Sequence, residues 1–128
     1  MKINNIVVEY VVEDVEATIA FYQQLLNFKL EVFEKENDHM YWAKLVKENF
    51  QISFKDAKKI NGEYSFIKNV PIGGSITLVL QVDDIHETYA IIQQKCELLN
   101  HPHLTACGAT EFSVKDPNGY FITFEVPQ

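Results

Sequence analysis

The hydrophobic pattern of this chain changes between the two-residue period of strands and the wider period of helices. Residues 3–12 alternate and are rich in β-branched side chains, which predicts a strand. Apolar residues then recur at helical spacing, at Val15, Ile19, Tyr22 and Leu26. Asp14, just before them, is a suitable N-cap. We therefore expect a helix from Asp14 to about Leu26, with these four side chains buried.

Three further strands are expected at residues 28–34, 40–46 and 50–55, with polar turn residues between them. The breakers Asn61-Gly62, Pro71 and Gly73-Gly74 then predict a linker over 57–74. The same order of elements follows: a strand at 75–82, a helix from Asp84 to about Lys95, a short strand at 97–100, and strands at 109–115 and 120–126. Asp116-Pro117-Asn118-Gly119 supplies the turn of this last hairpin.

The two halves also repeat in sequence at an offset of 70 residues. Val12-Glu13-Asp14-Val15 returns as Val82-Asp83-Asp84-Ile85, and Ile52-Ser53-Phe54 returns as Ile122-Thr123-Phe124. Two copies of one supersecondary unit within 128 residues indicate a single pseudo-symmetric domain. We expect an α+β fold with module one over 1–56, a linker over 57–74 and module two over 75–128, the two sheets enclosing a cleft.

Strand alternation divides the side chains into an apolar face, which should pack beneath the helices, and a mixed face. The apolar face comprises Ile6, Val8, Tyr10, Val12, Phe50, Ile52, Phe54, Ile76, Leu78, Leu80, Val82, Ile122 and Phe124. The mixed face includes Val7, Glu9, Gln51, Ser53, Lys55, Thr77, Phe121, Thr123 and Glu125. It is typical of a ligand cleft with a few placed polar groups, although a solvated exterior gives the same pattern.

Two aromatic residues of the third strand are assigned by the same parity. Trp42 aligns with Phe112 across the repeat, which places it in the core, whereas Tyr41 falls on the mixed face. Phe33, Tyr64 and Phe66 are further candidates for lining the pocket.

Composition narrows the class of function. The formal charge of −7 argues against nucleic acid as a partner and mildly favours cationic small molecules. The chain has no apolar run long enough to span a bilayer, no charged-then-apolar start typical of a secretion signal, and only two cysteines. We therefore expect a cytoplasmic protein with no membrane partner.

These patterns together resemble the vicinal oxygen chelate superfamily, which includes glyoxalase I, extradiol dioxygenases and bleomycin resistance proteins. The resemblance rests on Val-x-Asp-[Val/Ile] before each helix, on Phe21-Tyr22, and on the hairpin from Gly108 to Phe124. That hairpin is most similar to the bleomycin-resistance branch, although Cys107 stands where that branch often has an aromatic residue. The resemblance implies two βαβββ modules and a homodimer that binds small molecules.

The superfamily's enzymes hold a divalent metal with four residues, usually His, Gln or Glu. The resemblance places these positions at Val7, Ser53, Thr77 and Thr123, none of which is a good metal ligand. We therefore expect no cofactor and no metal. The protein should bind and sequester an aromatic or amphipathic ligand, cationic ones included, rather than act as an enzyme.

Other interpretations stay open. Glu9 and Glu125 lie two residues from the lost ligand positions, so a displaced metal site would give a lyase, an isomerase or a dioxygenase. Lys55 on the same face instead favours a Glu-Lys-Glu cluster that anchors a polar ligand, ahead of a structural ion pair and of catalysis. The third hypothesis is a subunit or regulatory module whose fold serves protein contact only. His101-Pro102-His103 lacks a third metal ligand nearby, and Cys107 is a reactive thiol only if it faces the cavity.

Overall fold

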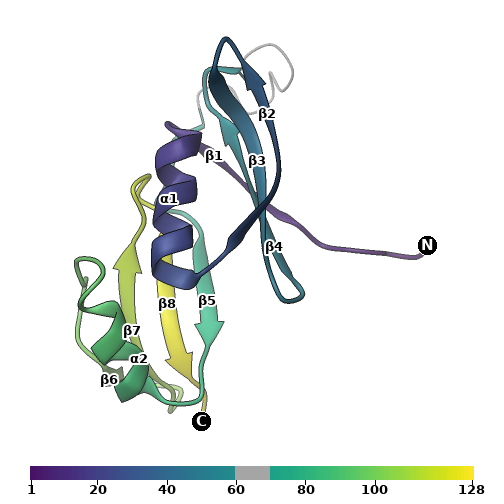
Figure 1. Cartoon of the computed structure of the whole chain (residues 1–128). Helices are drawn as coiled ribbons and strands as arrows, with labels where there is room; N and C mark the ends of the chain where they lie inside the picture. The colour runs from purple at the N-terminus through teal and green to yellow at the C-terminus, as the bar shows by residue number, and fades with distance from the viewer. Residues whose placement is uncertain (60–69) are drawn as a thin grey trace. The chain divides into compact units, whose positions relative to one another are not determined.

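The computed structural model describes residues 1–59 and 70–128, and its chain divides into two compact units, Met1–Ile72 and Gly73–Gln128. The described residues of each unit form one helix and one four-stranded sheet in the order strand, helix, strand, strand, strand (Figure 1). The predicted α+β fold of two tandem βαβββ modules is therefore confirmed.

The first unit contains β1 (Val8–Val12), α1 (Val15–Leu26), β2 (Lys29–Glu36), β3 (His39–Lys47) and β4 (Phe50–Asp56). Its sheet has the order β1-β4-β3-β2, in which β1 runs parallel to β4 and the other neighbours are antiparallel. Hairpins join β2 to β3 and β3 to β4, while α1 carries the chain from β1 to the opposite edge of the sheet. The predicted strand at 3–12 is shorter than expected, because pairing with β4 begins at Val8.

Helix α1 is fixed at both ends by polar contacts. The Asp14 carboxylate accepts a hydrogen bond from the Ala17 N–H at 3.0 Å, as expected of an N-cap. At the other end Asn27 adopts a left-handed φ of 58°, and the Lys47 ammonium donates to the Leu26 carbonyl at 2.7 Å. The helix predicted from residue 14 to 26 is thus confirmed, with a strand residue covering its exposed carbonyl.

The core of the first unit lies between α1 and its sheet. All four side chains of the predicted helical stripe are buried: Val15, Ile19, Tyr22 and Leu26. The ring of Tyr22 contacts Phe54 of β4 and Phe28, with centroids 5.1 and 6.3 Å apart. Three residues assigned to the apolar face, Ile6, Phe50 and Ile76, are instead exposed, because they lie before or at the ends of their strands.

The second unit contains β5 (Thr77–Gln81), α2 (Ile85–Ile92), β6 (His103–Leu104), β7 (Thr110–Lys115) and β8 (Phe121–Val126), in the sheet order β5-β8-β7-β6. Phe112 stacks on Phe124 at 5.0 Å, and Tyr89 of α2 meets Phe112 edge-on at 5.3 Å. Helix α2 ends before the predicted Lys95. The short strand predicted at 97–100 is wrong, since that segment makes only an isolated bridge and β6 begins at His103.

The sequence offset that relates equivalent residues of the two units differs by one between the two strands of the last hairpin. Ser53 of β4 pairs with Lys44, whereas the equivalent Thr123 of β8 pairs with Ser113. The β4 and β8 residues are 70 positions apart, but the β3 and β7 residues are 69 apart. Two residues separate the paired Lys47 and Phe50 at the first turn. Three separate Asp116 and Tyr120, which are hydrogen-bonded at the second.

This difference in turn length corrects the assignment made for Trp42. A shift of one residue moves every side chain of a strand to the opposite face. The structural counterpart of Phe112 is therefore Ala43, which is fully buried. Trp42, which pairs with Lys55, therefore lies on the face away from α1, the reverse of its prediction, while Tyr41 is the extra residue where the β2–β3 register shifts.

Two adjacent glycines give a matched test of the packing at the start of the second unit. Gly73 and Gly74 both have positive φ, but an added Cβ would lie 2.4 Å from the Asn118 carbonyl oxygen at Gly73 and in open space at Gly74. Gly74→Ala should lower the free energy of unfolding by about 1–2 kcal/mol through backbone strain alone. Gly73→Ala should lower it by clearly more. Equal losses in chemical denaturation would show that the close approach is absent.

Candidate functional site

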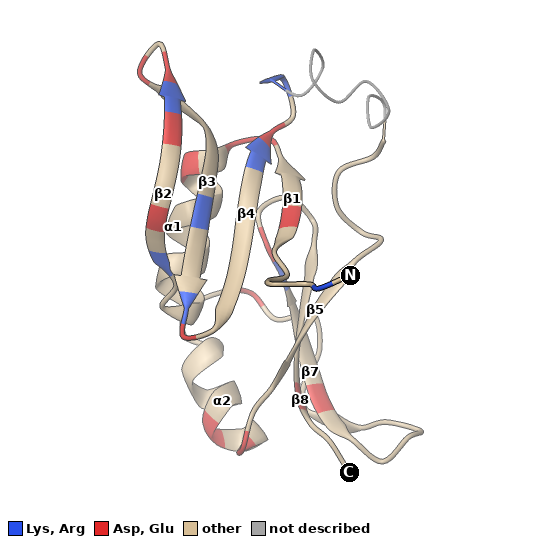
Figure 2. Cartoon of the chain, turned by 90° about the vertical axis from the view of Figure 1, so that its right-hand side faces the viewer, with Lys and Arg blue, Asp and Glu red and all other residues tan. Residues whose placement is uncertain are grey.

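The face of the first sheet that points away from α1 carries both charged and apolar side chains. Register sets Glu9 of β1 beside Ser53 of β4, and Lys55 of β4 opposite Trp42 of β3. Acidic and basic positions are interspersed over these strands, as Figure 2 shows. We call the group Glu9, Trp42, Ser53 and Lys55 the Glu9 cluster.

The Glu9 carboxylate is held from three sides within this cluster. The Trp42 indole Nε1–H and the Ser53 hydroxyl both donate to Glu9 Oε1 at 2.9 Å. The Lys55 ammonium lies 3.5 Å from Oε2, and its side chain is only 13% exposed, against 40% for Glu9. The carboxylate is thus fixed in position, and Oε2 keeps room to accept a hydrogen bond from a ligand.

Among the site residues predicted in the first unit, the structure brings Glu9, Ser53 and Lys55 together. Gln51 lies on the same face, opposite Val46. Val7 comes just before β1 and is 40% exposed. The predicted site residues that meet in the cluster are thus those on the paired strands β1 and β4.

The predicted residues of the second unit form a group of their own on the corresponding face. Thr77 pairs with Phe121 across β5 and β8, and Thr123 shares a hydrogen bond of 2.7 Å with the Ser113 hydroxyl. Gln81 donates to the Glu125 carboxylate at 3.2 Å. The face assigned to these residues is confirmed, while their contact with a ligand stays a prediction.

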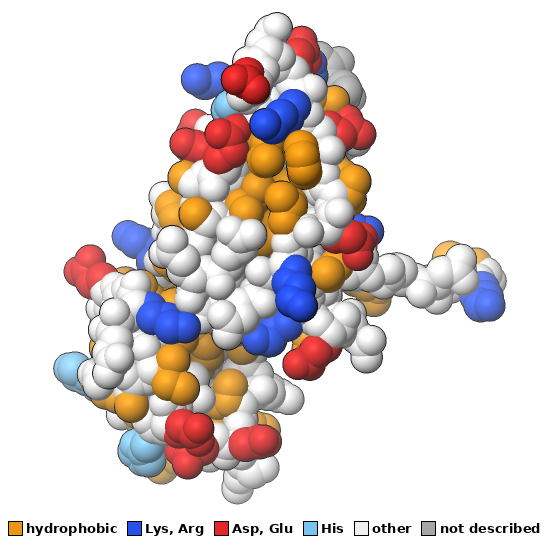
Figure 3. Space-filling model, viewed as in Figure 1, with side chains coloured by type: hydrophobic (Ala, Val, Ile, Leu, Met, Phe, Trp, Pro, Cys, Tyr) orange, Lys and Arg blue, Asp and Glu red, His pale blue; other side chains and the backbone are white. Residues whose placement is uncertain are grey.

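Trp42 is the site residue that sequence reasoning missed, and the length of the β3–β4 turn is the signal that could have found it. Tyr41 instead donates to Glu34 and lies beneath the Lys59 ammonium at 4.9 Å. Phe33 pairs with Ala43, so it lies on the helix-covered side. It is 45% exposed there, and Figure 3 shows hydrophobic side chains gathered between charged ones in the first unit. Tyr64 and Phe66 fall outside the described residues.

The residues at the four expected metal positions do not fit a divalent ion. Val7 has no donor atom, and the hydroxyls of Ser53 and Thr123 are bonded to Glu9 and Ser113. Thr77 offers only a neutral hydroxyl, which binds such ions poorly. Among residues 1–59 and 70–128, no three His, Cys, Asp or Glu side chains are grouped so that they could hold a metal ion.

Histidine and cysteine candidates of the second unit are engaged locally. His101 Nδ1 is 2.7 Å from the Tyr89 hydroxyl, and His103 Nδ1 is 2.9 Å from the His101 carbonyl oxygen. Cys107 is exposed, 3.6 Å from the Thr105 hydroxyl. The two histidines thus make separate contacts and do not converge on a shared point.

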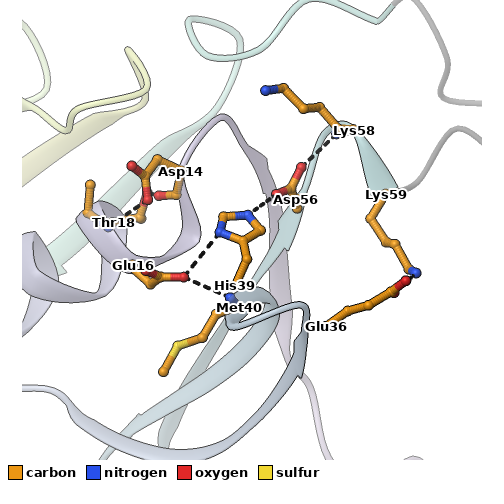
Figure 4. Close-up of polar contacts among 10 residues, drawn as sticks. Asp14, Glu16, Thr18, Glu36, His39, Met40, Asp56, Lys58 and Lys59 are labelled. Carbon is orange, nitrogen blue, oxygen red and sulfur yellow. Dashed lines mark hydrogen bonds and ion pairs between the residues drawn. The ribbon is translucent and has the colours of Figure 1, made fainter.

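A hollow of about 440 Å³ lies beside the first residue of β3 and the last residue of β4. Its lining consists of Glu36, Asn37, His39, Tyr41, Asp56, Lys58 and Lys59. His39 stands between two carboxylates in this region, as Figure 4 shows.

With the geometry established, comparison with known proteins identifies the family. The sequence profile of the Glyoxalase/Bleomycin resistance protein/Dioxygenase superfamily matches residues 2–124. The chain therefore belongs to this superfamily. Comparison with curated proteins gives no match.

Solved structures of the same fold include a glyoxalase/bleomycin resistance protein/dioxygenase from Nocardioides, with a TM-score of 0.81 and 16% identity over 98% of this chain and 84% of that one. A family enzyme from Burkholderia phytofirmans PsJN has a TM-score of 0.77 and 17% identity over 95% and 97% of the two chains. Virulence protein STM3117 from Salmonella typhimurium has a TM-score of 0.72 and 22% identity over the full length of both chains. At these identities the likeness shows the fold. Neither α1 nor α2 is long and apolar enough to cross a membrane, and the described residues contain no other helix that is.

Trp42 is the only tryptophan of the chain, so its indole N–H gives a single signal that reports on Glu9. Glu9→Gln replaces a charged acceptor by a weaker neutral one, and the indole proton should shift upfield in a ¹H–¹⁵N spectrum. Glu48→Gln, in the β3–β4 turn, removes the same charge without touching Trp42 and should leave the signal in place. An unmoved signal in Glu9→Gln would show that the indole is not bonded to Glu9.

Proposed function

We propose that this protein is a metal-free small-molecule binding protein that sequesters its ligand on the open face around the Glu9 cluster. The observation that carries the proposal is the fixed Glu9 carboxylate, with two donors on Oε1 and an ammonium beside Oε2. A side chain already held in one rotamer loses little conformational entropy when a ligand binds. The arrangement is suited to recognition of a donor group.

The chemistry of the site supports binding without a metal. The positions that hold metal in the superfamily's enzymes offer an aliphatic side chain and hydroxyls, two of which are already hydrogen-bonded. Lys55 places a positive charge beside the Glu9 carboxylate, where it would compete with a divalent cation. These residues supply no Lewis acid to polarise a substrate.

The same residues favour a ligand with both an aromatic or amphipathic body and a hydrogen-bond donor. Trp42 and Val11 of β1, which pairs with Lys55, offer contact area, and Glu9 Oε2 can accept from an N–H or an amine. The overall charge of −7 would attract a cationic ligand. The family resemblance adds a homodimer to the proposal, as well as contacts from Thr77, Phe121, Thr123 and Glu125.

Bleomycin and mitomycin C serve as probes for this proposal, and Trp42 fluorescence together with calorimetry measures their binding. At least one should bind, and Glu9→Gln should weaken the affinity by about tenfold to a hundredfold, the value of a hydrogen bond to a charged group. Glu48→Gln is the matched control and should bind as the native protein does.

Equal affinity in the native protein and Glu9→Gln would overturn the assignment of the site. If a probe binds and Glu9→Gln and Glu48→Gln have the same affinity for it, Glu9 has no role in binding. If neither probe, at millimolar concentration, binds or raises the thermal midpoint, the proposed ligand class is wrong.

A further inference from the structure

His39 lies where three elements of the first unit meet. The two-residue turn Asn37-Asp38 has positive φ at both positions, 52° and 64°, and it sets Glu36 opposite His39 across the β2–β3 hairpin. Asn and Asp tolerate this conformation better than other side chains, and such turns match the twist of paired strands. The turn therefore places His39, the first residue of β3, opposite Glu36 at the end of the hairpin.

Both ring nitrogens of His39 face carboxylates from other elements (Figure 4). Nε2 is 2.8 Å from Asp56 Oδ2 at the end of β4, and Nδ1 is 3.3 Å from Glu16 Oε1 in the first turn of α1. Glu16 Oε1 also accepts from the Met40 backbone N–H at 2.7 Å. Asp56 is itself anchored, because its side chain is 5% exposed and accepts from the Lys58 N–H at 2.7 Å.

The protonation state of the ring decides how many of these contacts are favourable. A neutral imidazole has one N–H, so one of its nitrogens must present a lone pair to a carboxylate. Only the imidazolium can donate through Nε2 to Asp56 and at the same time present a protonated, positively charged Nδ1 side to Glu16. We propose that His39 is a protonation switch. Its imidazolium holds the β2–β3 hairpin against α1 and β4, and the hairpin is released when the ring loses its proton.

The charges around the ring favour the protonated form. Helix α1 contributes Asp14 and Glu16, β4 contributes Asp56, and Asp38 stands in the adjacent turn. The cations of this region, Lys58 and Lys59, follow β4, and Lys59 is paired with Glu36 of β2. The hydrogen bond to Asp56 raises the pKa of His39 above 6.5, burial opposes this, and the negative charges of Glu16, Asp56 and Asp14 add to the rise.

The direction of the pH dependence follows from that rise. A histidine whose pKa is higher in the folded than in the unfolded chain stabilises the fold fully below the unfolded value of about 6.5. This contribution is lost as the pH rises through the folded value. The hairpin is therefore held at mildly acidic pH and loosens toward alkaline pH. Because His39 also lines the hollow with Glu36 and Tyr41, its release frees one wall of that hollow.

The test combines histidine ring NMR with amide hydrogen exchange. In the native protein His39 should titrate above 6.5, and Glu16→Gln should lower its pKa, since the amide keeps the bond from Met40 but loses the charge. Protection factors of the amides at 36–41 should fall between pH 6 and pH 8.5. His39→Gln should remove that pH dependence. His86→Gln is the matched control, because His86 stands in the first turn of α2 and faces solvent.

Each outcome decides the proposal. A His39 pKa at or below 6.5, or one that Glu16→Gln leaves unchanged, would overturn it. Protection factors that stay equal at pH 6 and pH 8.5 would overturn the release of the hairpin even if the ring titrates as expected. Loss of the pH dependence in His86→Gln would show that the effect comes from His86, and it would overturn the role of His39.

Discussion

The hydrogen bond from Trp42 to Glu9 depends on the two-residue length of the turn between β3 and β4. A turn one residue longer, as in the second unit, would carry the indole to the helix-covered side and leave the carboxylate with fewer donors. The Glu9 cluster is therefore a property of backbone register as much as of side-chain chemistry. The two units share a fold and differ at this point, where the first gains a tryptophan and the second buries a phenylalanine.

The same cluster explains why recognition suits the open face better than metal chemistry. A partly exposed carboxylate costs little to desolvate when an indole N–H, a hydroxyl and an ammonium already surround it. The indole N–H and the hydroxyl both bond Oε1, and the positive charge of Lys55 beside Oε2 would repel a divalent ion. A ligand N–H asks for less, since it adds one hydrogen bond to Oε2 and leaves the existing contacts in place. Belonging to the Glyoxalase/Bleomycin resistance protein/Dioxygenase superfamily is compatible with either chemistry.

Features set by local sequence could be predicted, and those set by distant contacts could not. The Asp14 cap, the buried stripe of α1 and the common face of Glu9 and Ser53 follow from spacing, because helix and strand periods are local. Trp42 was assigned to the wrong face, because parity was carried across a turn whose length differs between the repeats. The His39 contacts join residues 23 and 17 positions apart, Glu16 and Asp56, and no periodic pattern records such a meeting.

The central claim is that the open face of the first sheet binds a small molecule through Glu9 and without a metal ion. Its most direct test is the affinity of an untagged preparation for a bound probe, measured before and after exhaustive treatment with EDTA, with the metal content determined in parallel. The account predicts no stoichiometric divalent metal and an unchanged dissociation constant after chelation. Binding that disappears with EDTA and returns with one equivalent of nickel, zinc, iron or manganese would contradict it.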